Sequence, residues 1–395
     1  MTARFLATAS SEMQAVAVGW QIYSITHRPL DLGLAGLAQF LPGVLLFLVA
    51  GHAADRFPRR RIIMTCYAGF SLCSLGLLTL SAIASRAALR TAWPIYAVLL
   101  GNGVVRAFNG PAGQSFLPSL VAEEHFPNAV AWSSSIFTSA TVLGPALGGL
   151  VYGTMNSPLP VYGSAAIGAL IALALVGRIR LKLPVRARVA RSAAMILEGL
   201  RYIWRKKLVL GAMSLDLFAV LLGGAVALLP VYADRILKIG PSGLGLLRSG
   251  PAMGAMLIAL ATAYYPLKRH AGAAMLWCVA GFGTFTVVFG LSRNAALSMA
   301  ALVLLGACDM VSVIVRHTMV QLSTPDEMRG RVSAVNMVFI GASNEVGQFE
   351  SGLTAQWFGT VPAVVLGGLG TIGIVALWAW LFPELRRVDE LTKLR

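Results

Sequence analysis

The chain of 395 residues is too apolar for a water-soluble protein. Hydrophobic residues make up 57% of it and charged residues 12%, with a mean hydropathy of +0.75, whereas soluble domains are about 45–50% apolar and 25% charged. Its 32 lysines and arginines exceed its 16 aspartates and glutamates, which gives a net charge of +16. In a membrane protein this excess predicts contact with anionic lipid at the cytoplasmic face rather than with nucleic acid.

Twelve apolar stretches follow one another along the chain, each long enough to cross a hydrocarbon core of about 30 Å as a helix. They cover residues 4–26, 31–53, 61–84, 93–114, 129–153, 161–181, 208–232, 243–264, 272–292, 297–318, 332–355 and 362–382. The first contains Glu12, Gln14 and Gln21, so it does not match a cleaved signal peptide.

The basic residues lie mainly on one side of this topology. An even number of spans puts both termini on the same side, and that side carries 23 lysines and arginines against six on the other. The positive-inside rule then predicts that both termini are cytoplasmic, in a multi-pass protein of a bacterial-type inner (plasma) membrane.

A basic segment between the sixth and seventh spans separates two similar halves. An offset of 209 residues pairs Tyr23 with Tyr232 and Pro42 with Pro251, which indicates an internal duplication. We expect an N-terminal six-helix half at 1–181, a cytoplasmic linker at 182–207, a C-terminal half at 208–382 and a tail at 383–395. Such halves are the architecture of a transporter that rocks around a site at their interface.

The segment from Gly51 to Arg61, GHAADRFPRRR, joins the second and third spans. Through Gly51, Asp55, Arg56 and Arg60 it resembles motif A of the major facilitator superfamily, although Pro58 stands where that family commonly has glycine. The resemblance implies a conformational latch on the cytoplasmic side, in which Asp55 meets the positive end or an arginine of another helix. The basic cluster alone also fits a positive-inside anchor.

The fifth span carries Gly144-Pro145-Ala146-Leu147-Gly148-Gly149. This resembles motif C of superfamily exporters and antiporters, so the resemblance implies efflux. Glycines spaced by four residues let another helix pack closely, and Pro145 permits a kink.

Three polar residues, Asn102, Arg106 and Asn109, share one face of the fourth span. Arg106 resembles the motif B arginine of the superfamily, which is implicated in proton transfer. An arginine held by helix carbonyls for packing is the alternative.

The segments 321–334 and 341–345 resemble the subgroup of the superfamily that contains the enterobactin exporter and macrolide efflux proteins. The resemblance runs over nearly the whole chain. It implies an all-α fold of twelve transmembrane helices and a substrate resembling a drug or a siderophore.

Five acidic residues lie within the predicted spans, where a carboxylate is costly and by default marks a proton or substrate site. They are Glu12, Asp216, Asp309, Glu345 and Glu350. We expect Glu12 and then Asp216 to carry the coupled proton, with Arg106 as modulator, because the first and seventh helices line the central cavity in this superfamily.

The remaining charges stay open to more than one interpretation. Asp309 and Arg316 share a helix face, so they form either an ion pair or part of a site. Arg248 either binds an anionic substrate or satisfies a helix contact. Glu345 is a possible partner of motif A, and Glu345 and Glu350 point about 140° apart around their helix.

No ATP-binding or hydrolytic motif occurs, so an enzyme is not expected, and neither a cofactor nor a metal is required. We expect a monomeric, proton-coupled exporter working by alternating access, whose partners are a small-molecule substrate, protons and membrane lipid. An ion-coupled importer is the main alternative, and a nontransporting receptor or scaffold is a third.

Overall fold

The computed structural model describes residues 1–87, 91–179, 193–265 and 269–389, and this part of the chain is helical without strands. The helices of the N-terminal part are α1 (Thr2–Thr26), α2 (Pro29–Leu45), α3 (Phe47–Arg56), α4 (Arg59–Ala87), α5 (Trp93–Phe116), α6 (Phe126–Met155) and α7 (Leu159–Gly177). They are followed by α8 (Ala193–Arg205), α9 (Lys207–Leu222), α10 (Leu229–Val231), α11 (Gly240–Tyr264), α12 (Ala271–Leu291), α13 (Ala295–Leu322), α14 (Asp326–Phe358), α15 (Thr360–Leu381) and α16 (Pro383–Arg387). The prediction of an all-α fold is confirmed.

Two predicted spans are not single α-helices. The second is interrupted at Leu46, one turn after Pro42 and Gly43, the two poorest helix formers. The seventh leaves the α-helix at Gly223 and continues through a 3₁₀ turn at Ala225–Leu228, α10 and a π-helical turn at Tyr232–Ile236. Here two consecutive glycines and Pro230, which lacks an N–H, replace the regular ladder.

Eight helical segments among the described residues are long and apolar enough to cross a membrane. They are Arg59–Ile83, Phe126–Met155, Leu159–Gly177, Lys207–Ile236, Gly240–Tyr264, Ala271–Leu291, Ala295–Leu322 and Thr360–Leu381. The other four predicted spans fall on α1, on α2 with α3, on α5 and on α14, and as spans they remain predictions.

Large apolar side chains stand exposed on these helices. Leu72 is 71% exposed, Trp277 77% and Trp380 77%. Water would penalise so much apolar surface, whereas surrounding lipid would not. The helices therefore have the outer faces of a multi-pass membrane protein.

The chain divides into two compact units. Unit 1 comprises residues 1–191 with 238–249, and unit 2 comprises residues 192–237 with 250–395. Helix α11 begins in unit 1 and ends in unit 2.

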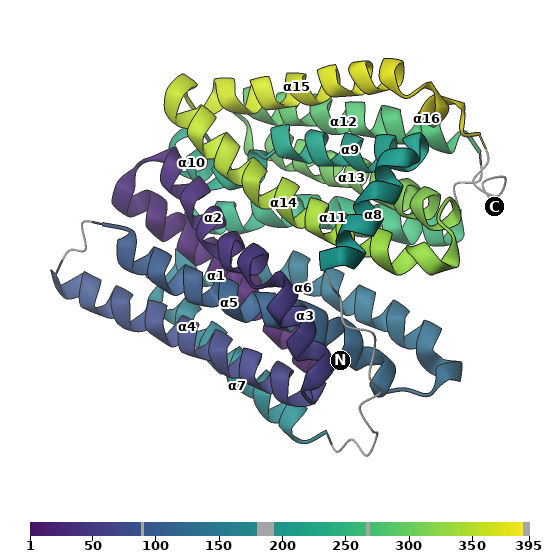
Figure 1. Cartoon of the computed structure of the whole chain (residues 1–395). Helices are drawn as coiled ribbons and strands as arrows, with labels where there is room; N and C mark the ends of the chain where they lie inside the picture. The colour runs from purple at the N-terminus through teal and green to yellow at the C-terminus, as the bar shows by residue number, and fades with distance from the viewer. Residues whose placement is uncertain (88–90, 180–192, 266–268, 390–395) are drawn as a thin grey trace. The chain divides into compact units, whose positions relative to one another are not determined.

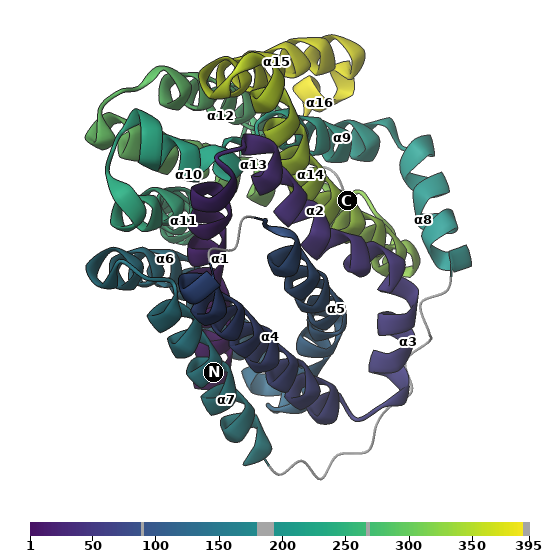
Figure 2. The same ribbon diagram turned by 90° about the vertical axis from the view of Figure 1, so that its left-hand side faces the viewer.

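Unit 1 is built around α1, which packs along α6 and α7 and also contacts α2 (Figure 2). Its buried polar side chains bond to neighbouring helices: Ser74 donates to Gln14 over 2.5 Å, and Tyr162 donates to Gln21 over 2.6 Å. Gln21 also donates to Ser81 Oγ over 2.9 Å. These glutamines therefore join α1 to α4 and α7 and are satisfied within the unit.

In unit 2, α12 packs against α13 and α15, and α9 packs against α14 and α15 (Figure 1). The break at Gly223 and Gly224 lets the backbone approach its neighbours. A Cβ at Gly224 would lie 2.7 Å from the carbonyl oxygen of Gly347 on α14, which is too close for any other residue without movement.

Part of the predicted cytoplasmic linker is the amphipathic helix α8, which packs on α14. Ile203 is fully buried, Tyr202 donates to the carbonyl of Ser323 over 2.9 Å, and Arg331 pairs with Glu198 at 2.9 Å. Residues 182–192 of that linker and 390–395 of the predicted tail lie outside the described residues.

The network around Gln21 predicts a stability defect. Replacing Gln21 by Leu leaves the Tyr162 and Ser81 hydroxyls without this buried partner, at about 1–3 kcal/mol for each group left unsatisfied. We expect the melting temperature of the purified protein in detergent to fall. Ser11→Ala, on the exposed face of the same helix, is the control and leaves it unchanged; equal melting of the two variants would contradict the role of Gln21.

Candidate functional site

The motif C residues lie on α6, where Gly144 and Gly148 face α1. A Cβ at Gly144 would lie 2.7 Å from Cβ of Glu12, and one at Gly148 would lie 2.7 Å from Cα of Met13. Neither helix leaves room for a side chain at these positions. The two glycines therefore set how closely the helix that carries Glu12 approaches α6.

The other side of motif C faces the first turns of α11, within the same unit. A Cβ at Gly149 would lie 2.7 Å from Cα of Gly245, and one at Gly245 would strike the carbonyl oxygen of Pro145. One turn further on, the hydroxyl of Ser249 donates to the carbonyl of Val142 over 2.8 Å. Helix α6 thus positions α1 on one face and the start of α11 on another.

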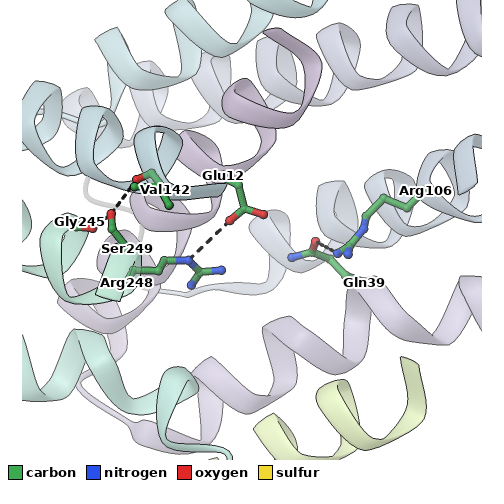
Figure 3. Close-up of polar contacts among 7 residues, drawn as sticks. All are labelled: Glu12, Gln39, Arg106, Val142, Gly245, Arg248 and Ser249. Carbon is green, nitrogen blue, oxygen red and sulfur yellow. Dashed lines mark hydrogen bonds and ion pairs between the residues drawn. The ribbon is translucent and has the colours of Figure 1, made fainter. Parts of the chain in front are cut away.

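This arrangement brings Glu12 and Arg248 together. Nε of Arg248 lies 3.9 Å from Oε2 of Glu12, and Figure 3 shows the two side chains pointing toward each other. The exposed fraction is 28% for the Arg248 side chain and 31% for that of Glu12. A long, partly exposed ion pair of this kind contributes only about 0–1 kcal/mol. A proton or a cationic group can therefore replace Arg248 at the Glu12 carboxylate, and an anionic group can replace Glu12, at little cost.

A second polar pair lies beside the first in Figure 3: Arg106 on α5 donates to Oε1 of Gln39 on α2 over 3.1 Å. Arg106 is exposed, whereas Asn102, one turn earlier, is buried and its Oδ1 has no hydrogen-bond partner among the described residues. Asn109 is half-buried. The predicted polar face of α5 is therefore present, with its arginine reaching toward α2.

Motif A lies on α3 and the start of α4. Gly51 is buried and Arg56 is exposed, while the side chain of Asp55 lies outside the described residues. Arg60 donates from Nε to the carbonyl of Val176 over 3.1 Å and also to the carbonyl of Gly177. A guanidinium at these last carbonyls of α7 satisfies groups that the helix leaves unpaired and complements its dipole.

Unit 2 holds a separate, buried charge cluster on α9, α13 and α14. Arg316 pairs with Asp216 at 3.2 Å and donates to Oδ1 of Asn336 over 2.8 Å. The exposed fraction is 3% for the Arg316 side chain and 8% for that of Asp216. The sequence suggested Asp309 as a possible ion-pair partner of Arg316, whereas in the structure the guanidinium pairs with Asp216 on α9.

Asp309 lies on α13 two turns before Arg316, and the charges of both Asp216 and Arg316 act on it. Glu345 accepts a hydrogen bond from Gln348 over 3.2 Å, and Glu350 accepts one from Thr354 over 2.7 Å. The last two acids thus bond within α14, and their wider roles stay predictions.

Several contacts of these residues were not predicted. Gln39, which the offset of 209 residues pairs with Arg248, was not predicted as the partner of Arg106. Asn336 is one of several amides in the predicted span 332–355, so the sequence did not single it out, and nothing in the sequence indicated that Arg60 contacts α7. A cavity of about 360 Å³ at the junction of α9, α15 and α16 is lined by none of the predicted site residues. Among the described residues no group of three or more His, Cys, Asp or Glu side chains is arranged to hold a metal.

The close contacts of motif C predict a specific sensitivity to a single methyl group. Gly149→Ala places a Cβ against the backbone of Gly245, at the cost of about 1–3 kcal/mol typical of overpacking. We expect a lower melting temperature of the purified protein. Gly110→Ala is the matched control, since a Cβ there meets nothing within 4 Å; if both alanine variants melt alike, α6 does not depend on this contact.

Comparison with known proteins places the whole chain in one family. Residues 1–394 match the family described as transmembrane secretion effector. The enterobactin exporter EntS of Shigella boydii serotype 4 (strain Sb227) is 28% identical over 399 residues, which cover 98% of this chain and 92% of that relative. EntS of Escherichia coli O139:H28 (strain E24377A / ETEC) matches with the same identity and coverage.

Solved transporter structures share the fold. The nucleoside transporter NupG matches with a TM-score of 0.74 at 14% identity, covering 97% of this chain and 98% of that one. A bacterial homologue of the iron transporter ferroportin, in an inward-facing state, matches with a TM-score of 0.71 at 14% identity. The match covers 98% of this chain and 97% of that one. A D-xylose–proton symporter matches at 0.70 and 13%, covering 96% of each chain. The chain therefore belongs to the transmembrane secretion effector family, within the major facilitator superfamily of membrane transporters.

Proposed function

We propose that this transporter is a proton-coupled exporter of a drug-like or siderophore-like small molecule, working by alternating access. In this proposal it is a monomer with twelve spans in two six-helix halves and with both termini in the cytoplasm of a bacterium. The similarity to enterobactin exporters supports export and a substrate of that size. Asp55, with Gly51, Arg56 and Arg60, is proposed as the cytoplasmic latch.

The observation that carries the coupling is the open ion pair of Glu12 and Arg248. The Glu12 carboxylate has three competing partners: a proton, Arg248, and a cationic or hydrogen-bond-donating group of the substrate. When Arg248 or the substrate occupies the carboxylate, the proton leaves. Proton and substrate therefore exclude one another, which is what antiport requires.

The same pair also specifies how the importer alternative would differ. An anionic substrate that binds Arg248 would leave the Glu12 carboxylate without its cation and so favour its protonation. Proton and substrate would then bind together, as in a symporter. The sign of the proton change on substrate binding, release for antiport and uptake for symport, separates the two functions. A receptor or scaffold would produce no flux in either direction.

The first test is gradient-driven transport in inside-out vesicles, with enterobactin as the first probe and a macrolide as the second. A gradient of one pH unit supplies about 1.4 kcal/mol per proton, or a tenfold difference in accumulation. We expect Glu12→Gln to lose this stimulation while still exchanging substrate without a gradient, because the proton site is gone and the pathway remains.

Glu124→Gln, which removes an exposed acid outside the site, serves as the control and keeps the full stimulation. Purified protein should also release protons when the probe binds. Gradient-driven accumulation that survives in Glu12→Gln would refute the assignment of Glu12, and proton uptake on binding would favour the importer.

Orientation is tested by labelling single cysteines in a variant whose four native cysteines are replaced by serine. Asn156→Cys, between α6 and α7, should react with a membrane-impermeant reagent added outside intact cells. Ser192→Cys, in the predicted basic linker, should react only after the membrane is opened, since the excess of positive charge predicts that it is cytoplasmic. Labelling of both cysteines from outside would contradict the twelve-span topology.

A further inference from the structure

The charge cluster of unit 2 contains one carboxylate more than its cations balance. Asp216 and Asp309 face a single arginine, Arg316, which is almost fully buried. Both outer nitrogens of that arginine are already engaged, one with Asp216 and the other with Asn336. An unbalanced carboxylate inside a membrane protein is costly, and a bound proton removes that cost.

Among the described residues, Asp216 and Arg316 are the charges that act on Asp309. Of the helices around Asp309, α9 contributes Asp216, and the part of α11 in unit 2 carries no charged residue. On α12 the only ionisable group is Cys278, which bonds to Cys308 of α13. Helix α14 places the neutral Asn336 against Arg316. Its own charged residues have other contacts: Arg329 pairs with Asp326, Arg331 pairs with Glu198, and Glu345 and Glu350 accept hydrogen bonds within α14. His317 on α13 itself is exposed.

Two buried polar atoms on the same face of α13 as Asp309 have no hydrogen-bond partner among the described residues. The hydroxyl of Ser312 and Nε of Arg316 make no hydrogen bond to any described residue, although both side chains are at least nine-tenths buried. Ser312 stands three residues after Asp309 and four before Arg316, so all three share one face of the helix. Both atoms can donate to an ionised carboxylate reaching along that face.

We propose that Asp309 is a proton-binding site of unit 2, with the ion pair of Asp216 and Arg316 beside it. With the proton bound, Asp309 is neutral and the pair is balanced. When the proton leaves, the Asp309 carboxylate takes the free donors of Ser312 and Arg316 and competes with Asp216 for the guanidinium. Because Asp216 is on α9 and Asn336 is on α14, proton loss changes how both helices are held to α13.

This inference deepens the proton coupling proposed above, by adding a second acid that is independent of Glu12. Proton binding at Asp309 does not itself require that transport be proton-driven. It is therefore tested by a measurement that needs neither substrate nor gradient.

The experiment is an infrared pH titration of the purified full-length chain, following the carbonyl stretch of protonated carboxyl groups. Asp309→Asn should lose one component of that band, and Glu12→Gln should keep it. Asp216→Asn should also lose it, because Arg316 then pairs with Asp309 and keeps that carboxylate ionised. Ser312→Ala should keep the band but change its titration, since one donor to the ionised form is gone.

Asp326→Asn, an exposed acid at the start of α14, is the control and keeps the component. The proposal is overturned if Asp309→Asn retains the component, or if Asp216→Asn does. Should Asp309→Asn fail to fold, Asp216→Asn and Ser312→Ala still decide the question. If the component behaves as expected but transport ignores the pH gradient, the proposed exporter mechanism fails and the proton site stands.

Discussion

The contact of α6 with α1 on one face and with the first turns of α11 on another is the constraint on which the polar site of unit 1 depends. Glycines at 144, 148 and 149 remove the side chains that would hold these helices apart. Nε of Arg248 and Oε2 of Glu12 lie 3.9 Å apart, a long distance for an ion pair. A displacement of either helix by the thickness of one methyl group would separate them, so the motif acts on the charge pair through backbone distance.

The ion pairs Glu12–Arg248 and Asp216–Arg316 differ in what their removal costs. The Glu12–Arg248 pair is partly exposed and contributes about 0–1 kcal/mol, whereas breaking a buried pair such as Asp216–Arg316 costs about 3–5 kcal/mol, since it leaves one charge alone. The first pair is therefore suited to exchange partners during a transport cycle. The second is costly to break unless a neighbouring carboxylate takes the place of Asp216.

Hydropathy and charge predicted the helical class, and motif resemblance predicted the family, because both depend on local composition. The helix interruptions at Leu46 and Gly223 were not predicted. The hydropathy of an apolar segment is the same whether or not its helical hydrogen bonds are continuous. Intramembrane acids could be found from the sequence but not their partners. Arg316 pairs with Asp216 of α9 rather than with Asp309 of its own helix. This pairing depends on how α9 packs on α13, which the sequence does not show. The contacts of Gln39 with Arg106 and of Arg60 with the end of α7 also depend on helix packing, so the sequence could not predict them.

Helix α11 gives the two acid sites a common covalent connection. Its first turns are held in unit 1 by Gly149 and by the pair of Arg248 with Glu12, and from Gly250 onward it packs in unit 2 against α13. Gly306 lies on α13 three residues before Asp309, and a Cβ there would strike the backbone of Pro251 on α11. Under the proposed function, a proton on Glu12 frees Arg248 and loosens the start of α11, while a proton on Asp309 alters the helix against which the rest of α11 packs.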